Sequence, residues 1–176
     1  MPGDSFTFRN INSLTQWGIK VIAYDVFSAG KRNRSRTIPF RHGEYDYGEK
    51  FYDTRTVKLD CVTEDRVLTK AEMREVIYWL SKRSQLILWD EPDKFYVGEL
   101  MQSVDVNVFP KRTKQQFTLP MVCEPFAYGP QNIIEFSQGI NKVEYNGTAS
   151  TPTHIIIRNP NPFPVTKIRI TGIQHQ

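Results

Sequence analysis

Five basic residues gather in one short segment and form the first group in the sequence that could do chemistry. Residues 30–43 read GKRNRSRTIPFRHG and contain neither Asp nor Glu. The basic residues of this segment are Lys31, Arg32, Arg34, Arg36 and Arg41. Such a segment could grip nucleic acid phosphates, contact another protein chain, or form a solvated loop. A phosphate-binding surface usually gathers cations from several elements and adds aromatic side chains for stacking. The sequence does not place the second basic group, Lys111, Arg112 and Lys114, beside the first, so specific nucleic-acid binding is not favoured.

Acidic and histidine residues give no recognised metal or catalytic pattern. Asp90, Glu91 and Asp93 lie in the segment DEPD, which lacks the glycine and the spacing of a calcium loop and favours a turn. The histidines are His42, His154 and His175. Their spacing is not that of a zinc site, and the sequence has no phosphate-binding glycine loop and no nucleophile elbow. We therefore predict a protein that is not an enzyme, with no catalytic residue, metal site or cofactor.

Composition is typical of a soluble globular chain of 176 residues, with 39% apolar and 24% charged residues. No stretch is long and apolar enough to span a bilayer, and the N-terminus lacks the apolar core of a signal peptide. We therefore expect a protein that is made in a cytoplasm and has no membrane partner. In that setting we predict that Cys61 and Cys123 are buried apolar residues without a disulfide.

One helix is predicted from Thr69 onward. Glu72 follows Thr69 by three residues, which is the spacing of a capping box. The apolar residues Met73, Val76, Ile77 and Leu80 then recur at helical spacing and predict one buried face. Lys82 and Arg83 are expected to close the helix, where positive charge suits the helix dipole.

Alternating apolar residues predict strands on both sides of this helix, so we expect a mainly β fold. Val57, Leu59 and Cys61 are separated by polar residues, which indicates a half-buried strand. Further strands are expected in residues 17–27, in QLILW and in KFYVGELMQSVDVNVF, while EYDYGEKFYD reads as a turn or hairpin tip. Residues 104–108 and 117–123 alternate around the polar segment PKRTK and predict a β-hairpin.

A change in amino-acid composition near EPFAYGPQ predicts two domains, residues 1–125 and residues 126–176. The second holds short β candidates, NIIEFS, KVEY, THIIIRN and VTKIRI, with a tight-turn signal at Asn146-Gly147. About fifty residues lie near the lower limit for a core that is stable alone. We therefore expect this part to be completed by the first domain or by neighbours, or to begin a longer domain.

Several short motifs follow one another in a familiar order. They are Ile38-Pro39 with His42-Gly43, the W-x-x-P-D-x-x-Y-x-G core at 89–98, C-x-P-x-A-Y at 123–128, and N-G-T-A followed by Pro152. This order resembles the distal tail protein family of long-tailed, non-contractile bacteriophages, over residues 14–171. The residues that match the family's structural motifs are Pro39, Gly43, Trp89, Pro92, Tyr96, Gly98, Pro125 and Tyr128.

The resemblance implies a β-sandwich N-terminal domain with one α-helix and an extended β-hairpin, followed by a short, partial or reduced galectin-like β region. It implies a structural virion protein of the tail tip or baseplate, in which six copies form a ring. The ring would join the tail tube protein to the tail-associated hub protein and leave a channel for DNA. Receptor-binding or fibre proteins are further implied partners in host attachment. The implied location is the virion, after assembly in the cytoplasm of the host bacterium.

A role for the basic segment follows from this ring. Arg32, Arg34, Arg36 and Arg41 become candidate contacts to the next subunit or to the tube, because Arg binds carboxylates and backbone oxygens in bidentate fashion. A solvated loop remains the alternative. Candidate acidic partners are Glu44, Asp46, Glu49, Asp53 and the DEPD turn.

Other functions remain open at this point. Aromatic residues that follow the basic segment suggest a carbohydrate-binding β-sandwich module for host recognition as the main alternative. They are Tyr45, Tyr47, Phe51 and Tyr52. A tube or hub protein of a contractile tail would use similar ring contacts. A small hydrolase is disfavoured because no catalytic constellation is visible.

Overall fold

The chain forms two compact units, Met1–Asn132 and Ile133–Gln176. The computed structural model describes residues 4–32, 35–40, 42–46, 51–64, 66–101, 104, 106–107, 114–135, 147–149, 154–159 and 162–164. The boundary predicted between residues 125 and 126 falls inside strand β12, Gln116–Tyr128. The division lies after this strand because β12 pairs along its length with strands of the first unit.

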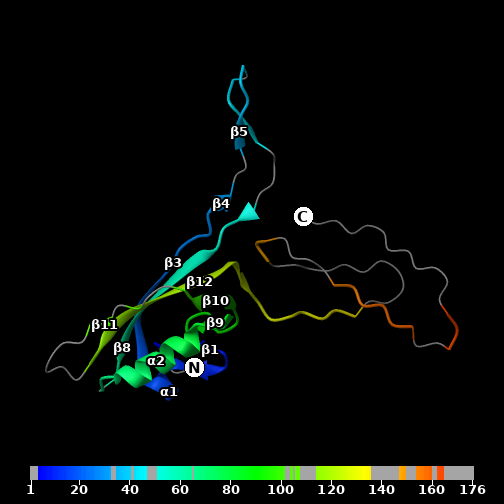
Figure 1. Ribbon diagram of the computed structural model, residues 1–176. Coiled ribbons are helices and arrows are strands. Elements are labelled where there is room, and N and C mark those ends of the chain that lie inside the picture. The colour runs from blue at the N-terminus through cyan, green and yellow to red at the C-terminus, as the bar shows by residue number, and fades with distance from the viewer. Residues whose placement is uncertain are drawn as a thin grey trace. The chain divides into compact units, whose positions relative to one another are not determined.

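The first unit is built on one eight-stranded antiparallel sheet (Figure 1). Its strand order is β2-β1-β9-β10-β12-β8-β3, with β11 paired to β12. The strands are β1 (Phe6–Phe8), β2 (Ile11–Asn12), β3 (Ile19–Val26), β8 (Arg55–Thr63), β9 (Ser84–Leu88), β10 (Phe95–Leu100), β11 (Val106–Asn107) and β12. The helices are α1 (Ser13–Trp17) and α2 (Lys70–Leu80). The predicted mainly β fold class, consistent with a β-sandwich, is confirmed.

Alternation along the central strands buries one face of the sheet. Val57, Leu59 and Cys61 of β8 are fully buried, as their spacing predicts. On β12 the buried residues recur in the same way and include Phe117, Leu119, Met121 and Cys123. The pairing of Val106 with Phe117 also confirms the predicted hairpin between β11 and β12. Cys61 and Cys123 are buried free thiols, as predicted.

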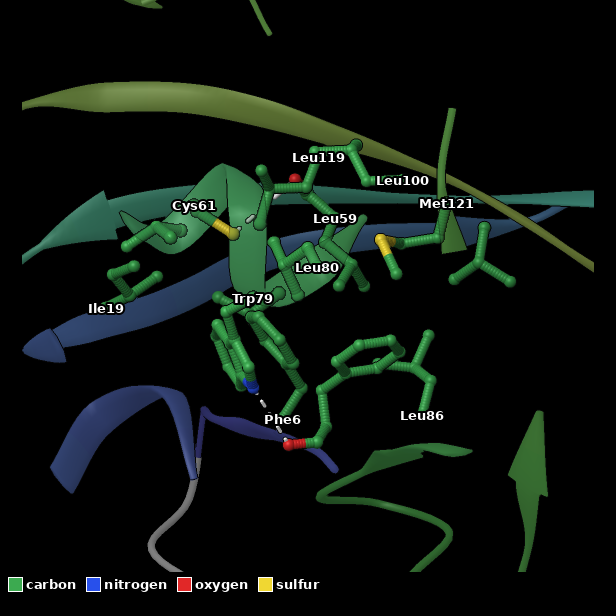
Figure 2. Packing of buried hydrophobic residues seen from close by; sticks show 14 of the residues in the cluster. Phe6, Ile19, Leu59, Cys61, Trp79, Leu80, Leu86, Leu100, Leu119 and Met121 are labelled. Atoms are coloured by element: carbon green, nitrogen blue, oxygen red, sulfur yellow. Dashed lines mark hydrogen bonds between the residues drawn. The ribbon is translucent and has the colours of Figure 1, made fainter. Parts of the chain in front are cut away.

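Trp79 of α2 lies at the centre of the core (Figure 2). Its ring stacks on Phe6 and meets the edge of Phe8, with ring centroids 5.8 Å apart in each case. The indole Nε1–H donates a hydrogen bond of 3.2 Å to the carbonyl oxygen of Phe8. The buried indole therefore has its polar atom satisfied while its large apolar surface joins the helix to strand β1.

Helix α2 begins as the sequence predicts. The Thr69 hydroxyl accepts from the Glu72 backbone N–H at 3.2 Å, and Glu72 Oε2 accepts from the Thr69 backbone N–H at 2.8 Å. The Thr69 N–H and hydroxyl both donate to the Glu72 carboxylate and hold its pKa below the usual value, and Arg66 adds to the effect. The predicted end is wrong, because α2 stops at Leu80 and Lys82 and Arg83 lie beyond its cap at Ser81.

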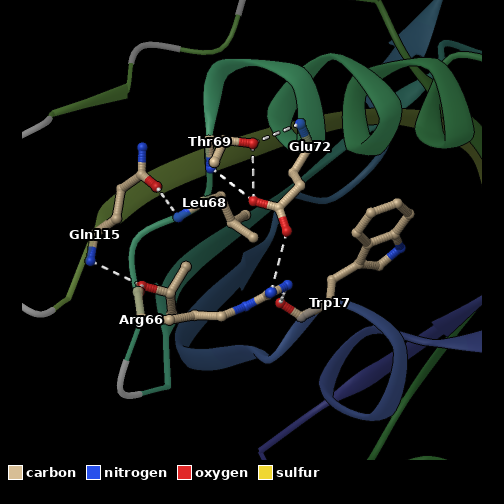
Figure 3. A network of polar contacts seen from close by, with 7 residues as sticks. Trp17, Arg66, Leu68, Thr69, Glu72 and Gln115 are labelled. Atoms are coloured by element: carbon tan, nitrogen blue, oxygen red, sulfur yellow. Dashed lines mark hydrogen bonds and ion pairs between the residues drawn. The ribbon is translucent and has the colours of Figure 1, made fainter.

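A polar network ties the start of α2 to other parts of the first unit (Figure 3). Arg66 forms an ion pair with Glu72 at 3.1 Å and donates to the carbonyl oxygen of Trp17 at 3.1 Å. The buried Gln115 accepts from the Leu68 backbone N–H at 3.2 Å through its side-chain oxygen. The linker between β8 and α2 is therefore fixed from both sides.

Replacement of Thr69 by Ala is expected to lower the free energy of unfolding by about 1 kcal/mol, because the first turn of α2 loses its capping hydroxyl. Urea denaturation followed by circular dichroism measures this change. Thr69→Ser keeps the hydroxyl and should recover most of the loss. Equal stability of the Ala and Ser variants would contradict the capping role.

Helix α1 is a short element that the sequence analysis did not predict. The Asn12 side chain accepts from the backbone N–H groups of Leu14 and Thr15, at 3.0 and 3.2 Å. Gly18 ends the helix in the left-handed conformation, with φ of 66°. An Asn followed six residues later by Gly is a signal that could have indicated this single turn.

Two predicted strands of the second unit are not formed where the structure describes them. Residues 133–135 and 154–159 carry no strand, and Ile155, Ile156 and Ile157 are all exposed. Their β-branched composition favours a strand, but a strand also needs a partner ladder. KVEY and VTKIRI lie outside the described residues. None of the helices in the described part of the chain is long and apolar enough to cross a membrane.

Candidate functional site: the β-hairpin arm

Strands β3 and β8 continue beyond the sheet as a two-stranded ribbon, residues 27–54, which we call the arm (Figure 1). The Phe27 N–H donates to the Thr56 carbonyl at 3.2 Å, and the Asp53 N–H donates to the Gly30 carbonyl at 2.8 Å. Pairing then continues through β4 (Lys31–Arg32) with β7 (Phe51–Tyr52) and β5 (Ser35–Thr37) with β6 (Glu44–Asp46). The extended hairpin implied by the family resemblance is therefore present.

The arm corrects two predictions made from the sequence. The basic segment 30–43 is not simply a loop, because its residues supply strands β4 and β5. The segment EYDYGEKFYD is not only a turn or hairpin tip, because its described residues supply strands β6 and β7. A two-stranded ribbon buries little on either face, so its residues show no apolar alternation that could indicate a strand.

The described residues 38–40 and 42–43 lie at the tip, and they hold the family motif Ile38-Pro39 and His42-Gly43. Gly43 has φ of 80°, a conformation that costs glycine little. Phe40 also has a positive φ, 67°, which is a strained conformation for a bulky residue, and its side chain is fully exposed. Arg41 lies outside the described residues. The tip therefore presents a large apolar side chain to solvent.

Arg32 is the candidate contact residue whose side-chain partner the structure shows. Its Nε–H donates to Asp53 Oδ1 at 2.8 Å, and its Nη2 contacts the same oxygen. The two side chains are 66% and 45% exposed, so the pair stabilises the ribbon by at most about 1 kcal/mol. Asp53, a predicted acidic partner, thus pairs within the arm. Arg36 lies on β5 opposite Tyr45, and Arg34 is outside the described residues.

Aromatic residues line the base of the arm. The Lys58 ammonium lies 5.2 Å from the ring centroid of Phe27, and the Tyr52 ring meets the edge of Phe126 at 5.2 Å. Phe51 is 58% exposed on β7. Tyr47 lies outside the described residues, and no side-chain geometry is described for Tyr45. The base of the ribbon is therefore anchored to the sheet on one side and open to solvent on the other.

Trp89 of the motif core packs against strand β3, and Pro92 lies in the turn before β10. The Trp89 ring meets Tyr24 edge to face at 5.2 Å, and the Tyr24 hydroxyl donates to the Asp90 carboxylate. This hydrogen bond, with burial, raises the pKa of Tyr24 to about 12. Pro92 lies in a turn closed by Lys94, whose ammonium pairs with Glu91 at 2.9 Å. The DEPD segment is thus a turn, as predicted.

Tyr96 and Gly98 lie on β10 in close contact with its neighbours. The Arg55 guanidinium lies 5.5 Å from the ring centroid of the buried Tyr96. A Cβ atom on Gly98 would stand 2.5 Å from Cys123 Sγ and 2.6 Å from the Val122 carbonyl oxygen. Glycine is required here because β12 approaches so closely.

Pro125 and Tyr128 belong to the end of β12. The Tyr128 hydroxyl donates to Glu124 Oε2 at 2.5 Å, and Arg83 pairs with the same carboxylate. These two contacts, the tyrosine first, lower the pKa of Glu124. Tyr128 also stacks on Phe95, with ring centroids 5.7 Å apart. Trp89, Tyr96, Gly98 and Tyr128 therefore make packing or polar contacts within the first unit, and Pro39 and Gly43 lie at the tip of the arm.

In the described ranges, no group of three or more His, Cys, Asp or Glu side chains could hold a metal ion. The residues that the structure does bring together, along the arm, are cationic, acidic and aromatic side chains at a solvent-exposed ribbon. Such a surface suits contact with another macromolecule.

No protein-family model matches the sequence, and no curated protein matches it either. One solved structure that the chain resembles is SPP1 Dit (gp 19.1), a paradigm of the hub adsorption apparatus in phages that infect Gram-positive bacteria. The match has a TM-score of 0.54 at 19% identity and covers 72% of this chain and 52% of that chain. A chain of the virion of a native gene transfer agent particle matches with a TM-score of 0.37 at 14% identity, over 63% of this chain and 85% of that chain.

The second match is too weak to support an argument, but the first shows a shared fold. The chain spans about half the length of SPP1 Dit. At the level of the fold, the resemblance to the distal tail protein family of long-tailed bacteriophages is therefore confirmed.

Proposed function

We propose that this protein is a structural component of a bacteriophage tail, namely a distal tail protein whose copies form a ring at the tail tip. The ring joins the tail tube to the hub and leaves a channel through which DNA passes. The single observation that carries the proposal is the fold shared with SPP1 Dit. The ordered motifs between Ile38 and Tyr128 support it independently, because they are features of the sequence and not of the fold.

The arm supplies the contact that such a ring needs. Subunits of a ring meet through heterologous surfaces, so one part of each copy must reach the next copy. The ribbon extends the sheet by a two-stranded segment that pairs with no other strand in the described part of the chain. Arg34, Arg36 and Arg41 are proposed to contact the next subunit or the tube, whereas Arg32 is already engaged by Asp53.

Native mass spectrometry of the purified protein, with negative-stain images of the same sample, tests the ring. The expected species has six times the monomer mass of 20.5 kDa and shows a central hole. If the isolated chain is monomeric, the same measurement is repeated with its tail tube protein, which would act as a template. A monomer under both conditions would contradict the ring.

The remaining roles belong to the same proposal. The hub protein binds the face of the ring opposite to the tube, and receptor-binding or fibre proteins attach at the periphery. The protein is then located at the tail tip of the virion after assembly in the host bacterial cytoplasm. Residues 133–176 are proposed to be a reduced galectin-like region, and its exposed isoleucines are available to such partners.

Carbohydrate binding is a second candidate, favoured by the exposed Phe51 ring on β7. Sugar recognition uses exposed aromatic platforms, but protein interfaces use the same residues. Titration of the monomer with host cell-wall glycans distinguishes the two functions. Saturable glycan binding that is lost in Phe51→Ala would support the module, whereas absence of binding together with ring formation would exclude it as the main role.

A further inference from the structure

The neighbouring strands β10 and β12 (Figure 1) carry aromatic side chains on the face of the sheet that points away from the core. Tyr96 and Gly98 of β10 are buried, so Phe95, which alternates with them, lies on the outer face. Tyr128 pairs with Phe95 in the ladder, and the two rings stack with centroids 5.7 Å apart. Phe126 lies two residues before Tyr128 and therefore points to the same side of β12.

Tyr52 of β7 extends this group of rings. Its ring meets the ring of Phe126 edge to face at 5.2 Å, and the residue is 40% exposed. Phe95, Phe126 and Tyr128 are each half-buried, so part of every ring is open to solvent. We call these four residues the aromatic row. Rings that are already held in place lose little conformational freedom when a ligand covers them.

A bulge in β12 lies at the centre of the aromatic row. Two successive pairs of β10 with β12 are separated by Val97 alone on β10 but by three residues, 124–126, on β12. Bulges re-aim side chains and are frequent beside functional sites. Pro125, in the middle of the bulge, has no N–H to donate to the ladder. Regular pairing is therefore interrupted at the point where the face carries its aromatic and charged side chains.

A fixed ion pair lies beside the aromatic row. The Tyr128 hydroxyl donates to one oxygen of the Glu124 carboxylate at 2.5 Å, and Arg83 contacts the other. The hydroxyl first and Arg83 second lower the pKa of Glu124, so its carboxylate stays ionised near neutral pH. The Arg83 and Glu124 side chains are 55% and 30% exposed. Because a carboxylate has several acceptor sites and a guanidinium several donors, both keep capacity for further hydrogen bonds.

This combination of groups fits a sugar. In a pyranose whose hydroxyl groups are equatorial, C–H bonds line both faces of the ring and can pack on aromatic rings. The hydroxyl groups lie at the rim, and each can donate and accept hydrogen bonds. The Glu124 carboxylate accepts and the Arg83 guanidinium donates. Since the two charges neutralise each other, the pair offers hydrogen bonds without a net charge, which favours a neutral ligand over an acidic or basic one.

We propose that the outer face of β10 and β12 binds a neutral carbohydrate chain of equatorially substituted pyranoses. Sugar rings pack against the aromatic row, and their hydroxyl groups bind Glu124 and Arg83. The site is distinct from Phe51, because Phe51 and Tyr52 are adjacent in β7 and point to opposite faces of the ribbon. The activity goes beyond the proposed ring and does not depend on it.

Isothermal titration of the full chain with chitohexaose and with cellohexaose, two neutral chains of equatorially substituted sugars, tests the site. Saturable binding of at least one of them is expected, and the acidic probe hexagalacturonate is expected to bind less tightly. Tyr52→Ala and Phe126→Ala should each weaken binding by about tenfold, since each removes an aromatic anchor. The matched control is Phe51→Ala, which removes a ring that is 58% exposed on the same strand and should leave the affinity unchanged.

Circular dichroism and thermal unfolding establish that each variant is folded. The exposed Tyr52 lies outside the core, so Tyr52→Ala keeps the test decisive even where Phe126→Ala is unstable. Glu124→Gln removes the charge that pairs with Arg83 and should also weaken binding. The inference is overturned if neither neutral chain binds, if Tyr52→Ala binds like the unchanged chain, or if Phe51→Ala weakens binding as much as Tyr52→Ala does.

Native mass spectrometry of the same samples separates this inference from the proposed function. Variants that form rings but bind the neutral chain about tenfold less tightly would support both the ring and the carbohydrate site. Glycan binding by a chain that never forms rings would contradict the ring and leave the carbohydrate site standing. If neither neutral chain binds and the Tyr52 and Phe126 variants lose ring formation, the face is a protein interface and the inference is overturned.

Discussion

Trp79→Ala is expected to lower the free energy of unfolding by about 3–5 kcal/mol, the usual cost of removing a large buried aromatic side chain. The substitution removes the stack on Phe6, the edge contact with Phe8 and the hydrogen bond to the Phe8 carbonyl. That carbonyl would lose its Trp79 donor in a buried environment, which adds to the cavity cost. Since small domains have only about 5–15 kcal/mol of stability, this one change would bring the first unit close to unfolding.

Chemical denaturation with intrinsic fluorescence and circular dichroism measures the loss. The matched control is Tyr78→Ala, the preceding residue of α2, whose ring is 63% exposed. A surface substitution of this kind should change stability by no more than about 0.5 kcal/mol. If the two variants were equally stable, Trp79 would not occupy the centre of the core.

Gly98→Ala is the second substitution that is expected to lower the free energy of unfolding strongly. The new methyl group would stand 2.5 Å from Cys123 Sγ, 2.6 Å from the Val122 carbonyl oxygen and 2.9 Å from Cys123 Cα. Real Cβ atoms do not approach so closely, so β10 and β12 would have to separate. Overpacking of this kind costs about 1–3 kcal/mol and occasionally more. The loss should appear as a lower midpoint in thermal or urea unfolding.

Two further variants show whether contact with β12 is the cause. Gly129→Ala places a methyl group where no atom lies within 4 Å and should be nearly neutral. Cys123→Ala in the Gly98→Ala background removes the sulfur contact but leaves the contact with the Val122 carbonyl, so recovery should be partial. A Gly98→Ala protein as stable as Gly129→Ala would show that the strands are not in close contact.

The elements that could be predicted from the sequence are those with a local residue pattern and one buried face. Val57, Leu59 and Cys61 alternate because one face of β8 is buried, and the Thr69–Glu72 box marks a helix start within four residues. Trp79 lay outside the predicted apolar stripe, although its position is three residues from Val76 on the same helix. Its burial depends on Phe6 and Phe8, which are distant in sequence and could be placed only by the sheet topology.

The arm could be predicted only by resemblance, for a physical reason. Both faces of a two-stranded ribbon meet solvent, so Lys31 and Arg36 look like loop residues to any test of periodicity. The register that places Arg36 opposite Tyr45 is set by pairing across the whole hairpin, not by local composition. The Arg32–Asp53 contact could not be predicted for the same reason. Asp53 is an expected acidic partner of the basic segment, but local composition does not say whether the partner belongs to the same copy.

The most direct test of the tail-tip assignment is the position of this protein in intact phage particles. Antibodies raised against the purified chain and coupled to gold are applied to the virions, and the label is located by electron microscopy. The proposed function predicts label at the end of the tail distal to the capsid, and loss of that label after competition with free protein. Specific label on the capsid or along the whole tail tube would contradict it.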